Sequence, residues 1–147
     1  MTDDRFDLQR FVTAQAPVFE VALEELRTGR KRTHWMWFIF PQLRGLGHSA
    51  TARFYGIGSP EEARAYAAHP LLGSRLTVCT RAVLDNTARS LHDIFGSPDD
   101  MKFRSCMTLF EAAVPQADPV FGQALEQWCA GERDLHTLRL ISETEAG

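Results

Sequence analysis

An aromatic block at residues 33–49 constrains the fold of this chain more than any other feature. Trp35, Trp37 and two phenylalanines fall within six consecutive positions, so two of the three tryptophans of the chain lie here. Rings this dense are buried in soluble proteins, and their polar edges then need hydrogen-bond partners or a ligand. The block follows the basic run 30–32 and leads into a loop with two glycines. We therefore expect the core to form around the block and a binding site to form at its edges.

Helix-start and helix-stop signals along the chain indicate an all-α fold. Ser59 and Ser97 each precede a proline and two acidic residues, a pattern that typically starts a helix. Ser49 is predicted to cap a further helix, and Thr33 a helical turn or two that Pro41 ends. No segment alternates polar and apolar residues in the manner of a strand. The prediction is a single compact orthogonal bundle of about seven to nine mostly short helices.

The helix predicted at residues 98–114 carries Met101, Cys106, Met107, Leu109 and Phe110 and is expected to be the central one. The last predicted helix spans residues 132–141 and is followed by a loose tail at residues 142–147. The whole chain, residues 1–147, is expected to form one domain, because its length suits a single hydrophobic core.

Charge and hydropathy exclude several classes of protein. The net charge of -3 and the pI near 5.9 argue against a general nucleic-acid binder, which would be strongly basic. The acidic start of the chain does not resemble a signal peptide, and no apolar run approaches the length of a membrane span. We expect a cytoplasmic protein without membrane association, either a monomer or a weak dimer.

The three cysteines are expected to be buried thiols. Cys79, Cys106 and Cys129 are odd in number, widely spaced and without a Cys-x-x-Cys or Cys/His pattern. The sequence therefore predicts no metal site, and it contains no cofactor fingerprint.

The loop that follows the aromatic block carries four candidate ligand-binding residues, Gln42, Arg44, His48 and Ser49. A glycine loop that leads into a helix N-terminus presents free N–H groups, which attract phosphate or carboxylate. A guanidinium adds bidentate recognition of the same groups. The sequence thus predicts binding of a small anion at this loop.

Three further candidates are His34, Trp35 and Lys102. Trp35 and Trp37 lie two positions apart and point in directions about 200° apart on a helix, so both cannot face the core equally. An indole that lines a pocket can stack on a base or a nicotinamide. Lys102 lies on a mostly apolar helix, where an ammonium group needs either a ligand or a partner such as Asp99.

Two functions of different classes remain open. The first is binding of a small phosphorylated or nucleotide-like ligand, with ADP-ribose as one example, in an aromatic and basic pocket. The alternative is a non-catalytic protein-interaction or adaptor module whose aromatic block is only its core. The sequence lacks a recognisable catalytic motif, and catalytic residues stay unassigned.

Several segments between residues 5 and 141 also carry a family resemblance: RFVTAQ at 10–15, HWMWFIFPQ at 34–42, RGLGHS at 44–49, HPLLG at 69–73, IFG at 94–96 and KFRSCMTLF at 102–110. Together they resemble the bacterial domain-of-unknown-function family eighteen-ten. Membership implies an all-helical fold. Members of this family often carry the label calpastatin, which does not suit a folded chain without disordered inhibitor repeats.

A weaker resemblance is to the NADAR superfamily, whose helical members are tied to ADP-ribose and NAD chemistry. Residues 33–42 would match the first block of that superfamily, and Lys102-Phe103 a later pair. The resemblance implies an N-glycosidic hydrolase acting on an ADP-ribose-like substrate. The first block here has no glutamate of its own, and the closing glycine-containing segment of the superfamily is missing from the sequence.

Overall fold

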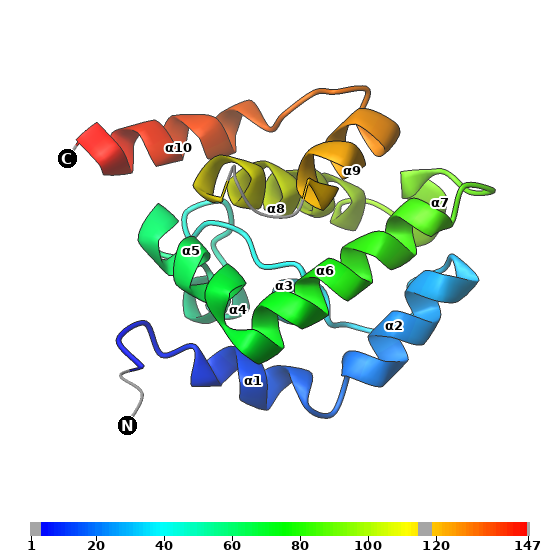
Figure 1. Ribbon diagram of the computed structural model, residues 1–147, viewed down its shortest axis with the longest axis horizontal. Helices are drawn as coiled ribbons and strands as arrows, with labels where there is room; N and C mark the ends of the chain where they lie inside the picture. The colour runs from blue at the N-terminus through cyan, green and yellow to red at the C-terminus, as the bar shows by residue number, and fades with distance from the viewer. Residues whose placement is uncertain (1–3, 115–118, 147) are drawn as a thin grey trace.

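The computed structural model describes residues 4–114 and 119–146 and confirms the all-α prediction (Figure 1). These residues form ten helices, where seven to nine were expected, and their only β-type pairing is one isolated bridge between Leu43 and Ile57. The helices are α1 Gln9–Gln15, α2 Phe19–Thr28, α3 Met36–Ile39, α4 Ala50–Tyr55, α5 Pro60–Ala68, α6 Pro70–Asp85, α7 Leu91–Phe95, α8 Asp99–Ala113, α9 Val120–Trp128 and α10 Leu135–Ala146.

Side-chain capping explains half of the helix starts. The side chains of Ser49 and Ser59 accept hydrogen bonds from the backbone N–H groups of Ala52 and Glu62, so both predicted caps are confirmed. Thr33 does not cap α3, which instead begins after Trp35 without a side-chain cap. The prediction for Thr33 is wrong because its hydroxyl donates to a buried carboxylate, described below.

Helix α8 lies at the centre of the bundle, as its apolar sequence predicted. It packs against α5, α7, α9 and α10, while α6 runs diagonally across α3 and packs against α2, α5 and α9 (Figure 1). The aromatic block joins this core through Phe40, whose ring centre lies 5.1 Å from that of Phe103 and 5.8 Å from that of Phe95. The start of α8 is therefore held beside the aromatic block.

Helix α10 differs from its prediction in position. It begins at Leu135 and continues through Ala146, so the loose tail expected from Ser142 is wrong for the described residues. The start is displaced because the carboxylate of Asp134 accepts the N–H and hydroxyl of Thr137, which caps the helix there. Leu135, the first residue of the helix, is 75% exposed, whereas Thr137 and Ile141 are buried.

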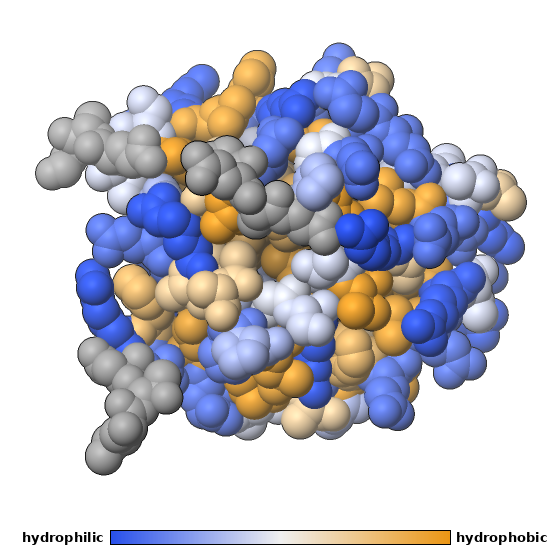
Figure 2. Space-filling model, viewed as in Figure 1, coloured by the Kyte–Doolittle hydropathy of each residue, from blue (hydrophilic) through white to orange (hydrophobic). Residues whose placement is uncertain are grey.

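The cysteines and the surface agree with the sequence analysis. Cys79 and Cys106 are buried thiols, and Cys129 is half-buried. Burial raises the pKa of Cys79 to about 12. Apolar residues on the face drawn in Figure 2 lie in separate areas between polar side chains. Among the described residues, no helix is both long and apolar enough to cross a membrane.

A buried arginine ties α1 to the loop between α4 and α5. The Arg10 guanidinium lies 2.7 Å from the Glu62 carboxylate and donates to the backbone carbonyls of Phe54 and Gly56. The other oxygen of Glu62 accepts the N–H of Gly58. Both charged side chains are only 6% exposed, so each depends on the other for compensation.

We predict that Arg10→Met destabilises the protein by about 3–5 kcal/mol, because it leaves the Glu62 carboxylate buried without its counter-ion. The matched control is Arg5→Met, which removes an exposed ion pair with Glu61 whose side chains are 66% and 60% exposed. The control is expected to change the free energy of unfolding by less than about 0.5 kcal/mol. Urea denaturation measures both, and equal losses would contradict the prediction.

Candidate functional site

Two cavities meet where α3 and α4 face the start of α8. The first, of about 200 Å³, is lined by Lys31, His34, Thr51 and Asp99, and we call it the lysine cavity. The second, of about 410 Å³, is lined by Gln42, His48, Ser49, Ser105 and His136, and we call it the histidine cavity. Trp37 and Lys102 line both cavities.

A single carboxylate positions the segment that leads into the lysine cavity. Glu25, in the last turns of α2, accepts the N–H groups of Arg32 and Thr33, the hydroxyl of Thr33 and the indole N–H of Trp35, all at 2.8 to 3.1 Å. Burial acts to raise the pKa of Glu25, but the hydrogen bonds from Arg32, Trp35 and Thr33 outweigh it and lower the pKa. Glu25 is therefore ionised, and it fixes Trp35 in the core.

The lysine cavity contains the only two lysines of the chain. The sixteen basic residues comprise fourteen arginines and two lysines. The Nζ of Lys31 lies 2.9 Å from one oxygen of Asp99, and the Nζ of Lys102 lies 3.2 Å from the other. The Lys31 Nζ also lies 5.1 Å from the centre of the Trp35 ring system. Two ammonium groups thus share one carboxylate, which leaves the cavity with a net positive charge.

The two lysine side chains differ in exposure: one is held inside the protein, and the other can be reached by a ligand. The Lys31 side chain is 8% exposed and is held by Asp99 and Trp35. Lys102 is 31% exposed and lines both cavities, so its ammonium group is accessible to a ligand. We interpret Lys31 as fixed charge and Lys102 as the group in contact with solvent.

Two glycines shape the loop beside the histidine cavity for different reasons. Gly45 has φ +106°, a conformation that residues with a side chain rarely adopt. Gly47 instead has no room for a Cβ, which would lie 2.8 Å from the Cβ of Ala52 and 3.2 Å from Cζ2 of Trp37. The absence of a side chain at Gly47 lets the loop pack against the Trp37 indole.

Gln42 is the buried polar residue of the histidine cavity. Its backbone is fixed because its carbonyl accepts the N–H of Ile57 at 2.8 Å, next to the bridge between Leu43 and Ile57. The residue is 3% exposed, and its Nε2 has no hydrogen-bond partner among the residues that the structure describes. An unpaired buried amide N–H costs about 1–3 kcal/mol, so this donor is unusual.

The structure places six of the seven predicted ligand residues around the two cavities. His34 and Trp35 line the lysine cavity, Lys102 lines both, and Gln42, His48 and Ser49 line the histidine cavity. Ser49 also caps α4.

Arg44 lies elsewhere. Its guanidinium donates to the carbonyls of Arg53 and Gly56 at 3.1 Å, where it caps the C-terminal end of α4. We therefore leave Arg44 out of the candidate site.

Sequence reasoning missed several cavity residues, of which Trp37 is the most important. Trp37 is half-buried, whereas Trp35 is 1% exposed and bonded to Glu25. The spacing of Trp35 and Trp37 indicated that their indoles point in opposite directions, but it did not show which of the two faces the core. Lys31 was treated only as part of a basic run, since nothing in the sequence places it against Asp99.

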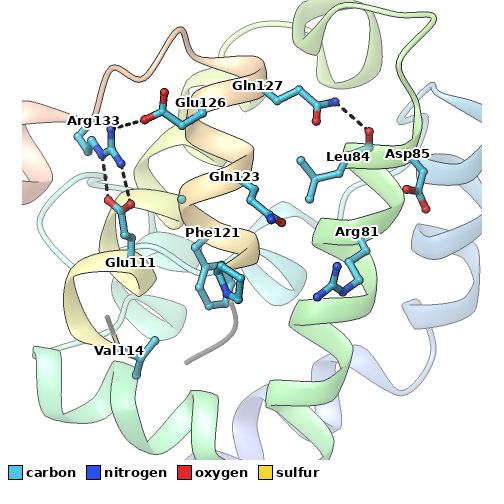
Figure 3. Close-up of a pocket in the computed structure, with 12 residues that line it drawn as sticks. Arg81, Leu84, Asp85, Glu111, Val114, Phe121, Gln123, Glu126, Gln127 and Arg133 are labelled. Carbon is cyan, nitrogen blue, oxygen red and sulfur yellow. Dashed lines mark hydrogen bonds and ion pairs between the residues drawn. The ribbon is translucent and has the colours of Figure 1, made fainter. Parts of the chain in front are cut away.

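A larger hollow of about 930 Å³ lies between α6, α8 and α9 (Figure 3). Figure 3 shows Arg133 bridging Glu111 and Glu126, with contacts of 2.7, 2.9 and 3.2 Å. Three carboxylates and two guanidinium groups line this hollow, so its net charge is negative. It is therefore a poorer candidate than the lysine cavity for binding an anion.

The fold and the two cavities define a class: all-α proteins with an aromatic block that meets a central helix at a lysine-containing site. The chain belongs to the family described as "Protein of unknown function (DUF1810)", which matches residues 5–141. It is also similar to the crystal structure of the conserved hypothetical protein Rv1873 from Mycobacterium tuberculosis, with 54% sequence identity and a TM-score of 0.92. That match covers 95% of this chain and 99% of the mycobacterial one. The comparison with curated proteins gives no match.

We predict that Glu25→Gln lowers the free energy of unfolding by about 1.5–3 kcal/mol at pH 7, because a charged acceptor of four hydrogen bonds is lost. The pKa of Glu25 is lowered in the folded state, so its contribution is full above the ordinary value of 4.5 and is lost as the pH falls through the lowered value. The difference between wild type and variant should therefore shrink in acid.

Denaturation across pH 3–7 tests this expectation, with Glu24→Gln at an exposed neighbouring position as the control. The control should match the wild type at every pH. A Glu25→Gln deficit that stays constant into acid would show that the ionised carboxylate is not what holds residues 32–35.

Proposed function

We propose that the protein binds a small phosphorylated, nucleotide-like ligand at the lysine and histidine cavities. The observation that carries the proposal is the convergence of both lysines on Asp99 beside a cavity. One carboxylate compensates one ammonium charge, so a second anion is needed to complete the pairing. A phosphate that enters from the Lys102 side would supply it.

The choice of lysine at these two positions favours a phosphate ligand. Lysine carries a compact charge with three N–H donors, and it binds phosphate as a point charge. The fourteen arginines elsewhere include several that make forked contacts to carboxylates and carbonyls, such as Arg10 and Arg133. A site lined by Lys31 and Lys102 therefore differs in chemistry from the structural cation sites of this fold.

The aromatic surface of the site supports a ligand that also carries a ring. Trp37 is half-buried and lines both cavities, so its indole is available on the cavity side. Stacking of a base on an aromatic side chain contributes about 1–3 kcal/mol in single-stranded nucleic-acid sites. A phosphate near Lys102 and a ring near Trp37 together describe a nucleotide-like molecule, of which ADP-ribose is an example.

The carboxylates near the site are already engaged by other groups of the protein. Glu25 is ionised and accepts four hydrogen bonds, Asp99 pairs two lysines, and Asp134 caps α10. A general acid or base must be able to exchange a proton with the substrate, and each of these groups already has its partners. We therefore assign no catalytic role to these carboxylates, and we limit the proposal to binding.

Calorimetric titration with ADP-ribose at low ionic strength tests the proposal. We expect saturable binding by the wild type and a loss of about 10–100-fold in affinity for Lys102→Met, because one charge-assisted contact is removed. Affinity should also fall as salt is raised, since the contact is ionic.

The matched control is Arg104→Met. Arg104 lies two positions further along α8, is 30% exposed compared with 31% for Lys102, and carries the same charge. It should retain wild-type affinity. If Lys102→Met and Arg104→Met lose the same affinity for ADP-ribose, the effect comes from the net charge of the protein and not from a contact with Lys102. If the wild type does not bind ADP-ribose, the adaptor alternative is favoured.

A further inference from the structure

We propose that the histidine cavity binds the uncharged ring of the same ligand and that Gln42 recognises a hydrogen-bond acceptor on that ring. The ligand class is then a nucleoside phosphate rather than a phosphate or a sugar phosphate alone. This inference rests on the proposed function, because it assumes that a phosphate occupies the lysine cavity.

The Gln42 amide is buried and, within residues 4–114 and 119–146, lacks a hydrogen-bond partner for its nitrogen. The side chain is buried, its backbone is fixed by the Ile57 pairing, and its Nε2 has no partner in the described part of the chain. Two other buried nitrogens share this lack, Arg104 Nε and Trp128 Nε1. Gln42 is distinguished from them because it lines the histidine cavity.

Three other polar groups around this cavity already have hydrogen-bond partners in the protein. The Ser105 hydroxyl donates to the carbonyl of Met101, the Ser49 hydroxyl caps α4, and the Asp134 carboxylate caps α10. These three groups already serve the fold. The His48 and His136 side chains also line the cavity, but both are exposed and can be hydrated. The buried Gln42 N–H cannot be, so it is the donor that a ligand carbonyl or ring nitrogen would satisfy.

The two cavities are neighbours that share wall residues. Trp37 and Lys102 form part of both walls, so a ligand that places its phosphate near Lys102 can extend past Trp37 toward Gln42. The histidine cavity, at about 410 Å³, lies in the ordinary size range of small-molecule sites. Gly47 keeps the loop packed against the Trp37 ring, which forms part of both walls.

The test compares three probes: inorganic phosphate, ribose 5-phosphate and AMP. We expect the wild type to bind AMP at least tenfold more tightly than ribose 5-phosphate. Gln42→Met removes the donor at similar volume and should reduce AMP affinity to that of ribose 5-phosphate, leaving the other two probes unchanged. Gln123→Met, at an exposed position on α9, is the control and should bind all three probes as the wild type does.

Stability distinguishes recognition from a structural role. Removal of an unpaired buried donor should leave the denaturation midpoint of Gln42→Met equal to or above that of the wild type. A lower midpoint would mean that the amide serves the fold rather than a ligand, and that result would overturn this inference. AMP affinity unaffected by Gln42→Met would overturn this inference while phosphate binding stands, whereas failure of all three probes to bind would overturn the proposed function itself.

Discussion

The arrangement around the site depends on the buried carboxylate of Glu25. It accepts hydrogen bonds from the backbone of Arg32 and Thr33 and from the Trp35 indole, which turns the chain at the end of α2 and seats the aromatic block. Because the turn is fixed, Lys31 is brought over the Trp35 ring and against Asp99 on α8. A stretch that would otherwise be a solvated basic loop becomes one wall of a cavity.

The second organising feature is that arginines and lysines make different kinds of contact in this structure. Arg10 and Arg44 tie loops together by donating to several backbone carbonyls at once, which a planar fork does well. Within residues 4–114 and 119–146, the two lysines make no such contacts to backbone carbonyls and meet one carboxylate instead. This contrast separates the cations that build the fold from those that we assign to a ligand, and it explains why Arg44 lies outside the site.

The sequence predicted the fold well because its signals are local. Ser49 and Ser59 cap helices in the way that their neighbours indicate, and α8 carries its apolar character in its own residues. The site was predicted less completely because its contacts are not local. Lys31 and Asp99 lie far apart in the chain, the Trp35 partner Glu25 lies in another helix, and only the packed structure decides that Trp37 faces the cavities.

The central claim is that Lys31 and Lys102 form one anion site, and NMR of the lysine side-chain ammonium groups tests it most directly. The chain has two lysines, so each of the two Nζ signals reports on this site without mutation. On titration with inorganic phosphate at low ionic strength, both signals should shift and fit one dissociation constant. Signals that do not move, or that follow two unrelated titration curves, would contradict the account.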